Sequence, residues 1–268
     1  MKTALLVLVI WGVSGGAAGA AEPHRIVSLS PAVTEILFAI GAGPQVVART
    51  SQCDYPVAAQ RLPKVGDFLT PNLESIVAQH PDLLIGVGYE DSAKRVALQR
   101  LPIRGLFLES PHGVEDVYRL ILAIGSQTQC TGKAQTLVDD LRAHLRPVVT
   151  SRPQRVVVLV WASPLIAAGP TTYLGDLVRL AGGRIVIDSK IGYPKISPEI
   201  LVASRPEVIL VTDLAMVKVV RRLPGMAQSR VPIRVLPADM VLRPGPRLAA
   251  GFAAVKQSLA VSAPGVSH

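Results

Sequence analysis

Short apolar runs alternate with amphipathic segments along most of the chain. Residues 25–29 and 155–160 are rich in β-branched side chains and apolar on both faces, which is typical of buried strands in a parallel sheet. A turn follows each run, and then apolar residues recur at helical spacing until a pair of glycines ends the segment, Gly41 and Gly43 or Gly182 and Gly183. The pattern predicts an α/β fold.

One of these units occurs twice. Residues 71–85 and 196–210 share a glutamate, Glu74 or Glu199, that opens a short amphipathic helix. In both copies a proline ends the helix, an acidic residue follows, and an aliphatic strand begins. The repeat predicts two similar Rossmann-like lobes.

A helical stripe between the two copies predicts how the lobes are joined. The stripe consists of Ala134, Leu137, Val138, Leu141 and Leu145. We expect an N-terminal lobe over residues 21–130, a single long backbone helix over 131–147, and a C-terminal lobe over 148–268. One continuous doubly wound sheet is the alternative. In both cases a ligand would bind at the carboxyl ends of the parallel strands.

Residues 1–20 have the features of a secretory signal peptide. Lys2 precedes an apolar run over residues 4–13, and Ala18-Gly19-Ala20 fits a cleavage site. The run is too short to span a bilayer, which needs roughly 20 residues; an N-terminal anchor helix is the alternative. No cysteine follows the run directly, so we expect a periplasmic protein without a lipid anchor.

The net charge of +9 changes this picture little. The basic residues are dispersed and few aromatic residues lie among them, which argues against nucleic acid as a partner. Cys53 and Cys130 would be exported to an oxidising compartment, where they form a disulfide or remain two unpaired thiols. Neither has a second ligand at zinc-type spacing, so we expect no metal site.

The sequence shows no catalytic constellation. It contains no nucleophile elbow, no phosphate-binding glycine loop, and no pair of histidines at metal-ligand spacing. We therefore expect no enzymatic activity and no resident cofactor.

The loops after the predicted strands carry the candidate binding residues. Asp54 and Tyr55 follow one strand, whereas Phe68 and Tyr193 precede the two copies of the repeat at equivalent positions. One aromatic ring from each lobe could clamp a large, flat, partly apolar ligand, although ordinary core packing is the alternative. Glu74 and Glu199 either stabilise their helix N-termini or provide one docking carboxylate per lobe for a two-fold importer.

Several motifs together resemble the periplasmic binding proteins that have a rigid helical backbone, in particular the vitamin B12-binding proteins of cobalamin ABC importers. The motifs are RIVSLSPAVTE at 25–35, CDYP at 53–56, PNLE at 71–74, PDLLI at 81–85, PE at 198–199 and RPGPRL at 243–248. The resemblance covers nearly the whole chain after the signal peptide.

This resemblance implies a ligand in the cleft between two lobes joined by one long helix. It also implies that Glu74 and Glu199 meet arginines of the importer's membrane subunits, and that Phe68 and Tyr193 hold the corrin ring. A further ligand-contacting stretch would comprise Asp239, Met240, Val241, Leu242 and Arg243. The implied cargo is cobalamin, bound by a monomer. A haem- or ferric-siderophore-binding protein, an exported enzyme and an adaptor that binds no solute are the alternatives.

The sequence departs from the family pattern in the number of aromatic residues. Gln52, Val87 and Ile166 stand where the best-known cobalamin binders have aromatic side chains. Trp161 and Tyr89 lie close by in sequence and could compensate.

Overall fold

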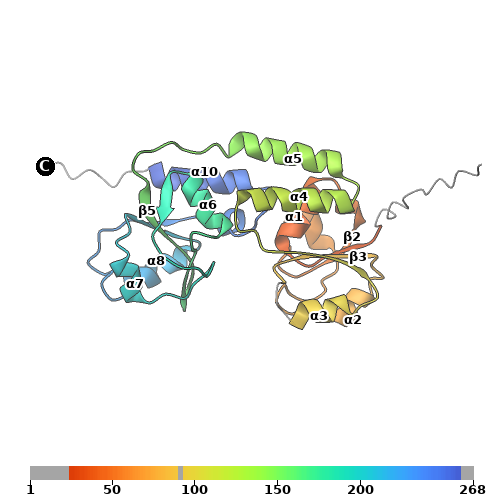
Figure 1. Cartoon of the computed structure of the whole chain (residues 1–268). Coiled ribbons are helices and arrows are strands. Elements are labelled where there is room, and N and C mark those ends of the chain that lie inside the picture. The colour runs from red at the N-terminus through yellow and green to blue at the C-terminus, as the bar shows by residue number, and fades with distance from the viewer. Residues whose placement is uncertain (1–23, 90–92, 261–268) are drawn as a thin grey trace, which may run out of the picture.

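The computed structural model describes residues 24–89 and 93–260, and Figure 1 shows two lobes beneath a shared layer of helices. The predicted signal peptide lies outside the described residues. The N-terminal lobe contains a parallel sheet in the order β2-β1-β3-β4. Its strands are β1 (Ile26–Ser28), β2 (Val46–Arg49), β3 (Leu83–Val87) and β4 (Arg104–Leu108).

Helices connect these strands. They are α1 (Pro31–Ala39), α2 (Leu73–Val77) and α3 (Ala93–Gln99), with the 3-10 helices η1 (Gly43–Gln45) and η2 (Val57–Arg61). In α1, Pro31 stands in the first turn, where its missing N–H costs no hydrogen bond.

The C-terminal lobe repeats this topology with one added hairpin strand. Its sheet has the order β6-β5-β8-β9, and β7 also pairs with β5. All pairs are parallel except the β5–β6 hairpin. The strands are β5 (Gln154–Ala162), β6 (Leu165–Ala167), β7 (Gly183–Ile185), β8 (Val208–Val211) and β9 (Ile233–Val235). The helices are α6 (Tyr173–Leu180), α7 (Pro198–Ala203), α8 (Leu214–Arg221), α9 (Ala238–Val241) and α10 (Leu248–Ala260).

The repeat extends to individual hydrogen bonds. Arg25 donates to the carbonyl oxygens of Gln79 and His80 at the end of α2, and Arg155 donates to those of Ser204 and Arg205 at the end of α7. His80 and Arg205 both have positive φ, 47° and 44°. Each lobe therefore uses an arginine at the start of its first strand to cap the helix that precedes the neighbouring strand.

Two helices precede the second lobe. After α4 (Val114–Gln127) a short turn leads into α5 (Thr131–His144), and the two pack against each other as a hairpin. The predicted linking helix over 131–147 thus ends at His144, and an irregular connection follows as far as β5. Pro147 accounts for the early end, because the residue before a proline is disfavoured in the helical region.

A continuous apolar core holds the lobes together. One cluster of buried side chains includes Val117 and Ile121 of α4, Leu177 of α6 and Phe252 of α10, together with residues from both sheets. The carboxylate of Asp176 on α6 also accepts the N–H of Val114 at the start of α4, at 3.0 Å. A shared core of this kind opposes hinge motion between the lobes.

Within the two described ranges, no helix is long and apolar enough to cross a membrane.

Candidate functional site

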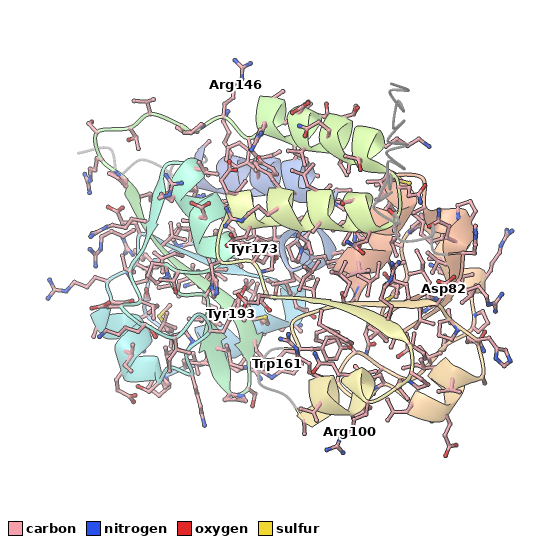
Figure 2. The ribbon with its side chains drawn as sticks, turned by 45° about the vertical axis from the view of Figure 1, so that its right-hand side comes forward. Asp82, Arg100, Arg146, Trp161, Tyr173 and Tyr193 are labelled. Carbon is pink, nitrogen blue, oxygen red and sulfur yellow. The ribbon has the colours of Figure 1, made fainter. Side chains whose placement is uncertain are left out.

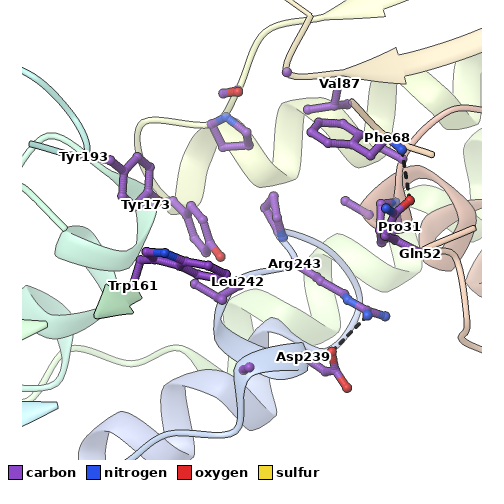
Figure 3. A pocket seen from close by; sticks show the side chains of 17 residues that line it. Pro31, Gln52, Phe68, Val87, Trp161, Tyr173, Tyr193, Asp239, Leu242 and Arg243 are labelled. Carbon is purple, nitrogen blue, oxygen red and sulfur yellow. Dashed lines mark hydrogen bonds and ion pairs between the residues drawn. The ribbon is translucent and has the colours of Figure 1, made fainter. Parts of the chain in front are cut away.

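A cleft of about 670 Å³ lies between the lobes, and side chains from both lobes line it (Figure 3). Its walls come from the loops after the sheet strands and from the N-termini of α1 and α6, where ligands of parallel α/β sheets bind. The lining residues are Ser30, Pro31, Ala32, Gln52, Phe68, Val87, Gly88, Ser110, Pro111, Trp161, Tyr173, Tyr193, Ala238, Asp239, Leu242, Arg243 and Pro244.

Aromatic rings stand on both sides of this cleft. Phe68 comes from the N-terminal lobe, and Trp161, Tyr173 and Tyr193 come from the C-terminal lobe (Figures 2 and 3). Trp161 and Tyr193 are 59% and 43% exposed, which is unusual for large aromatic residues without a covering partner. The cleft therefore offers apolar ring faces that a flat ligand could cover.

Contacts with Tyr89 and Gln52 fix the position of Phe68. Its ring lies 5.3 Å from the ring of the buried Tyr89, centroid to centroid, and its N–H donates to the side-chain oxygen of Gln52 at 2.9 Å. The Tyr89 hydroxyl lies 2.9 Å from the carbonyl oxygen of Leu29 and 3.0 Å from that of Phe68. Burial raises the pKa of Tyr89 well above its ordinary value, so the hydroxyl remains a donor. Tyr89 thus packs against Phe68 and supports it, but does not itself line the cleft. Phe68, Trp161, Tyr173 and Tyr193 are called the aromatic wall below.

The rings of the C-terminal lobe are fixed by their polar atoms. The Tyr173 hydroxyl donates to the carbonyl oxygen of Val241, and the Trp161 Nε1–H donates to that of Ser163 at 2.8 Å. Burial raises the pKa of Tyr193 to about 12, against the opposing effect of its hydrogen bond with Thr172. All three rings are therefore neutral near pH 7, with their faces available for stacking.

An ion-pair network joins the lobes at one side of the cleft. Arg243 contacts carboxylate oxygens of Glu35 at 3.3 Å, Asp54 at 2.5 Å and Asp239 at 2.9 Å. Arg247 binds Glu35 through Nε at 2.8 Å and through a terminal nitrogen at 2.5 Å, and its guanidinium lies 4.4 Å from the ring centroid of Tyr55. Glu35 is 2% exposed, so these arginines take the place of water as partners of its carboxylate.

The structure brings five of the nine predicted ligand residues to the cleft wall, namely Phe68, Tyr193, Asp239, Leu242 and Arg243. Asp54 and Tyr55 do not line the cleft, but they contact Arg243 and Arg247, respectively. Met240 and Val241 do not line the cleft, and Val241 is fully buried. The reason is helical spacing: positions 239, 242 and 243 share one face of α9 and its end, whereas 240 and 241 face away.

The sequence analysis missed Tyr173 and the start of α1 as parts of the wall. Both stand at the N-terminus of the first helix of their half, α1 after β1 and α6 after the β5–β6 hairpin, so they occupy equivalent positions in the repeat. The sequence analysis named three positions without the aromatic residue expected from the family pattern. Two of them, Gln52 and Val87, line the cleft, but Ile166 does not. Trp161 does line it.

Cys53 and Cys130 are both free thiols, so the disulfide alternative is not realised. Cys53 is buried with its sulfur 3.1 Å from the hydroxyl oxygen of Thr50, and burial raises the pKa of its thiol. Among the described residues no group of three or more His, Cys, Asp or Glu side chains could hold a metal ion.

Glu74 and Glu199 occupy the first turns of α2 and α7, and both are exposed. In Figure 1 these two helices lie on the same side of the molecule, one on each lobe, opposite the layer of α4, α5 and α10. A hydrogen bond from Ser197 lowers the pKa of Glu199. Each lobe therefore carries one of the two carboxylates in the first turn of a helix on this side of the molecule.

Comparison with known proteins identifies the fold. The family described as periplasmic binding protein matches residues 26–232. An uncharacterised ABC transporter substrate-binding lipoprotein of Bacillus subtilis is 27% identical over 89% of this chain and 80% of its own length. A vitamin B12-binding protein of Yersinia pestis is 28% identical over 84% of this chain and 82% of its own.

A solved periplasmic heme binding protein from Pseudomonas aeruginosa superposes with a TM-score of 0.78 at 24% identity, covering 91% of this chain and 95% of that one. This likeness concerns the two-lobed fold alone. Because the family match extends over most of both lobes, the chain belongs to the periplasmic binding protein family, the class of solute-binding proteins that serves ABC importers.

Proposed function

We propose that this protein binds cobalamin or a related corrinoid in the interlobe cleft and delivers it to the membrane subunits of an ABC importer. The observation that carries the proposal is the set of aromatic rings on both sides of the cleft, Phe68 opposite Trp161, Tyr173 and Tyr193. Opposed rings suit a flat macrocycle, because they cover both of its faces with apolar surface. The likeness to a vitamin B12-binding protein supports the same cargo.

The polar atoms of the cleft favour a corrinoid over haem. Protein-bound haem iron is held by an axial side chain, usually His, Cys, Met or Tyr. The lining residues within 24–89 and 93–260 include no His, Cys or Met, and the Tyr173 hydroxyl donates to the carbonyl oxygen of Val241. The cobalt of cyanocobalamin already has its full set of ligands and needs none from the protein.

Haem remains the second candidate cargo because Tyr193 lies in the cleft wall with a hydroxyl that could approach iron. The fold likeness to a heme-binding protein is consistent with this alternative. A ferric siderophore is the third cargo compatible with the scaffold.

Docking on the importer is assigned to Glu74 and Glu199. Their place on one face, one on each lobe, matches a two-fold partner that presents one basic residue to each. Export through the signal peptide over residues 1–20 is part of the proposal. So is release without a lipid anchor, although the Bacillus subtilis relative is named a lipoprotein.

A spectroscopic screen tests the cargo. The purified chain is incubated separately with cyanocobalamin, hemin and a ferric siderophore, and absorbance spectra are recorded after gel filtration. We expect near one-to-one retention of cyanocobalamin. Retention of hemin or the siderophore in its place would change the assigned cargo, and turnover of a bound compound would indicate an enzyme.

Variants of the aromatic wall test the site. Phe68→Ala and Tyr193→Ala should each weaken cyanocobalamin binding at least about fivefold, because a buried aromatic contact contributes more than about 1 kcal/mol. Leu69→Ala is the matched control, since Leu69 lies in the same loop as Phe68, is 63% exposed and does not line the cleft. Equal losses in all three variants would contradict the proposed site.

A further inference from the structure

Among the described residues that line the cleft, Arg243 is the one cationic side chain, and its guanidinium is already paired with carboxylates. One terminal nitrogen contacts Glu35 at 3.3 Å and Asp54 at 2.5 Å, and the other contacts Asp54 at 3.3 Å and Asp239 at 2.9 Å. A carboxylate on an incoming ligand would therefore have to displace an internal carboxylate to bind Arg243 bidentately.

The network as a whole is negative. It contains the three carboxylates of Glu35, Asp54 and Asp239 and the two guanidinium groups of Arg243 and Arg247, which leaves one negative charge. The hydrogen bond from Arg243 holds the pKa of Asp54 below its ordinary value, so this carboxylate is ionised near pH 7. An anionic group entering this end of the cleft meets net repulsion.

Asp239 presents this charge to the cleft. Its side chain is 60% exposed and lines the cavity, whereas the side chain of Arg243 is only 15% exposed (Figure 3). A carboxylate in this position accepts hydrogen bonds and donates none. Asp239 can therefore accept hydrogen bonds from amide N–H groups on the rim of a macrocyclic ligand, and it repels carboxylates on such a rim.

We infer that Asp239, together with Asp54, which binds the same guanidinium group, is a specificity-determining group that selects macrocycles with a neutral, amide-bearing rim and rejects those with an anionic rim. The inference rests on the proposed function, and it adds the charge of the substrate class. A corrinoid carries amides around its ring, whereas haem carries two carboxylates. Asp54 does not line the cleft and acts through Arg243 as a positioning residue.

The test compares the dissociation constants of cyanocobalamin and hemin for the wild type and for Asp239→Asn. The substitution removes the charge and keeps the shape, so the ratio of the two dissociation constants should shift at least about fivefold in favour of hemin. Asp54→Asn should shift the ratio in the same direction, and Asp239→Glu should restore the wild-type ratio. Raising the ionic strength should reduce the discrimination in the wild type, because salt screens exposed charges.

Asp188→Asn is the matched control, an exposed aspartate of the same lobe outside the cleft lining. An unchanged ratio of the two dissociation constants in Asp239→Asn would overturn the inference, as would an equal shift in Asp188→Asn. Thermal denaturation of each unliganded variant separates these results from loss of folding. If the wild type does not bind cyanocobalamin at all, the proposed function itself fails, and that result is distinct from an unchanged ratio in a protein that does bind it.

Discussion

Glu35 is the most buried charge of the interlobe network and the residue on which both arginines converge. It stands on α1 in the N-terminal lobe, whereas Arg243 and Arg247 follow α9 in the C-terminal lobe. At the scale of single residues, this contact joins the two halves with charge as well as with apolar surface.

Glu35→Ala should lower the free energy of unfolding by about 3 kcal/mol, because it leaves two largely buried guanidinium groups without their shared carboxylate. Urea denaturation measures the effect. Glu115→Ala is the control: its partner Arg142 lies 3.1 Å away, but both side chains are at least half exposed, so the loss should stay below about 1 kcal/mol. Similar losses in the two variants would contradict this account of the network.

Asp54 should make stability depend on pH in the acid range. Its folded-state pKa is lowered from 3.8, chiefly by the hydrogen bond from Arg243. A lowered pKa contributes stability that is fully present above the unfolded-state pKa and is lost as the pH falls through the folded-state pKa. The difference in melting temperature between the wild type and Asp54→Asn should therefore be constant above about pH 5 and shrink below about pH 4. A difference that grows on acidification would contradict the assignment.

At the scale of elements, the loop between β2 and α2 decides where Phe68 lies. Gly66 has φ +92°, and a Cβ at this position would lie 2.6 Å from the carbonyl oxygen of Thr70 and 2.7 Å from the N of Asn72. Asp67 accepts the N–H groups of Leu69 and Thr70, both at 2.7 Å. These contacts within the loop therefore constrain the backbone on both sides of Phe68.

Gly66→Ala should lower the melting temperature and weaken cyanocobalamin binding, because the backbone has to move to accept the new Cβ at a positive φ. Gly132→Ala, on the open face of α5 with no atom within 4 Å of a new Cβ, should instead stabilise the protein by up to about 1 kcal/mol and leave binding unchanged. Thermal denaturation and a ligand titration check both. A Gly66→Ala variant as stable as Gly132→Ala would show that the loop is not constrained.

At the scale of the whole molecule, the shared core and the helix layer fix the distance between the lobes, and therefore the distance between Glu74 and Glu199. Two charges at a fixed distance can bind a two-fold partner without the loss of conformational entropy that ordering two mobile domains would cost.

Glu74→Ala combined with Glu199→Ala should reduce co-purification with the importer's membrane subunits at least about tenfold and leave the affinity for cyanocobalamin unchanged. The control is Asp139→Ala combined with Asp188→Ala, which removes the same charge from exposed positions on other elements. A double glutamate variant that loses cyanocobalamin but still docks would contradict the docking assignment.

The two-lobed fold could be predicted from the sequence because its signals are local. The apolar run, turn and helix recur in each half, and so do the residues that end the short helices, such as His80 and Arg205. The sequence predicts a linking helix that ends at residue 147, three residues beyond the observed end at His144, because the pattern of apolar residues continues to Leu145. Phe68 and Tyr193 were found through their equivalent positions in the repeat.

Motifs along the chain indicated the family, and the repeat predicted two lobes that each contribute an aromatic residue to a cleft, because motifs and helix ends depend on neighbours a few residues apart. Only the packing of the two lobes shows which residues of α9 line the cleft, that Tyr173 lines it as well, and that Arg243 is paired with Glu35 and Asp54. Those contacts join residues 208 and 189 positions apart, so they depend on how the two lobes pack and leave no periodic signal in the chain.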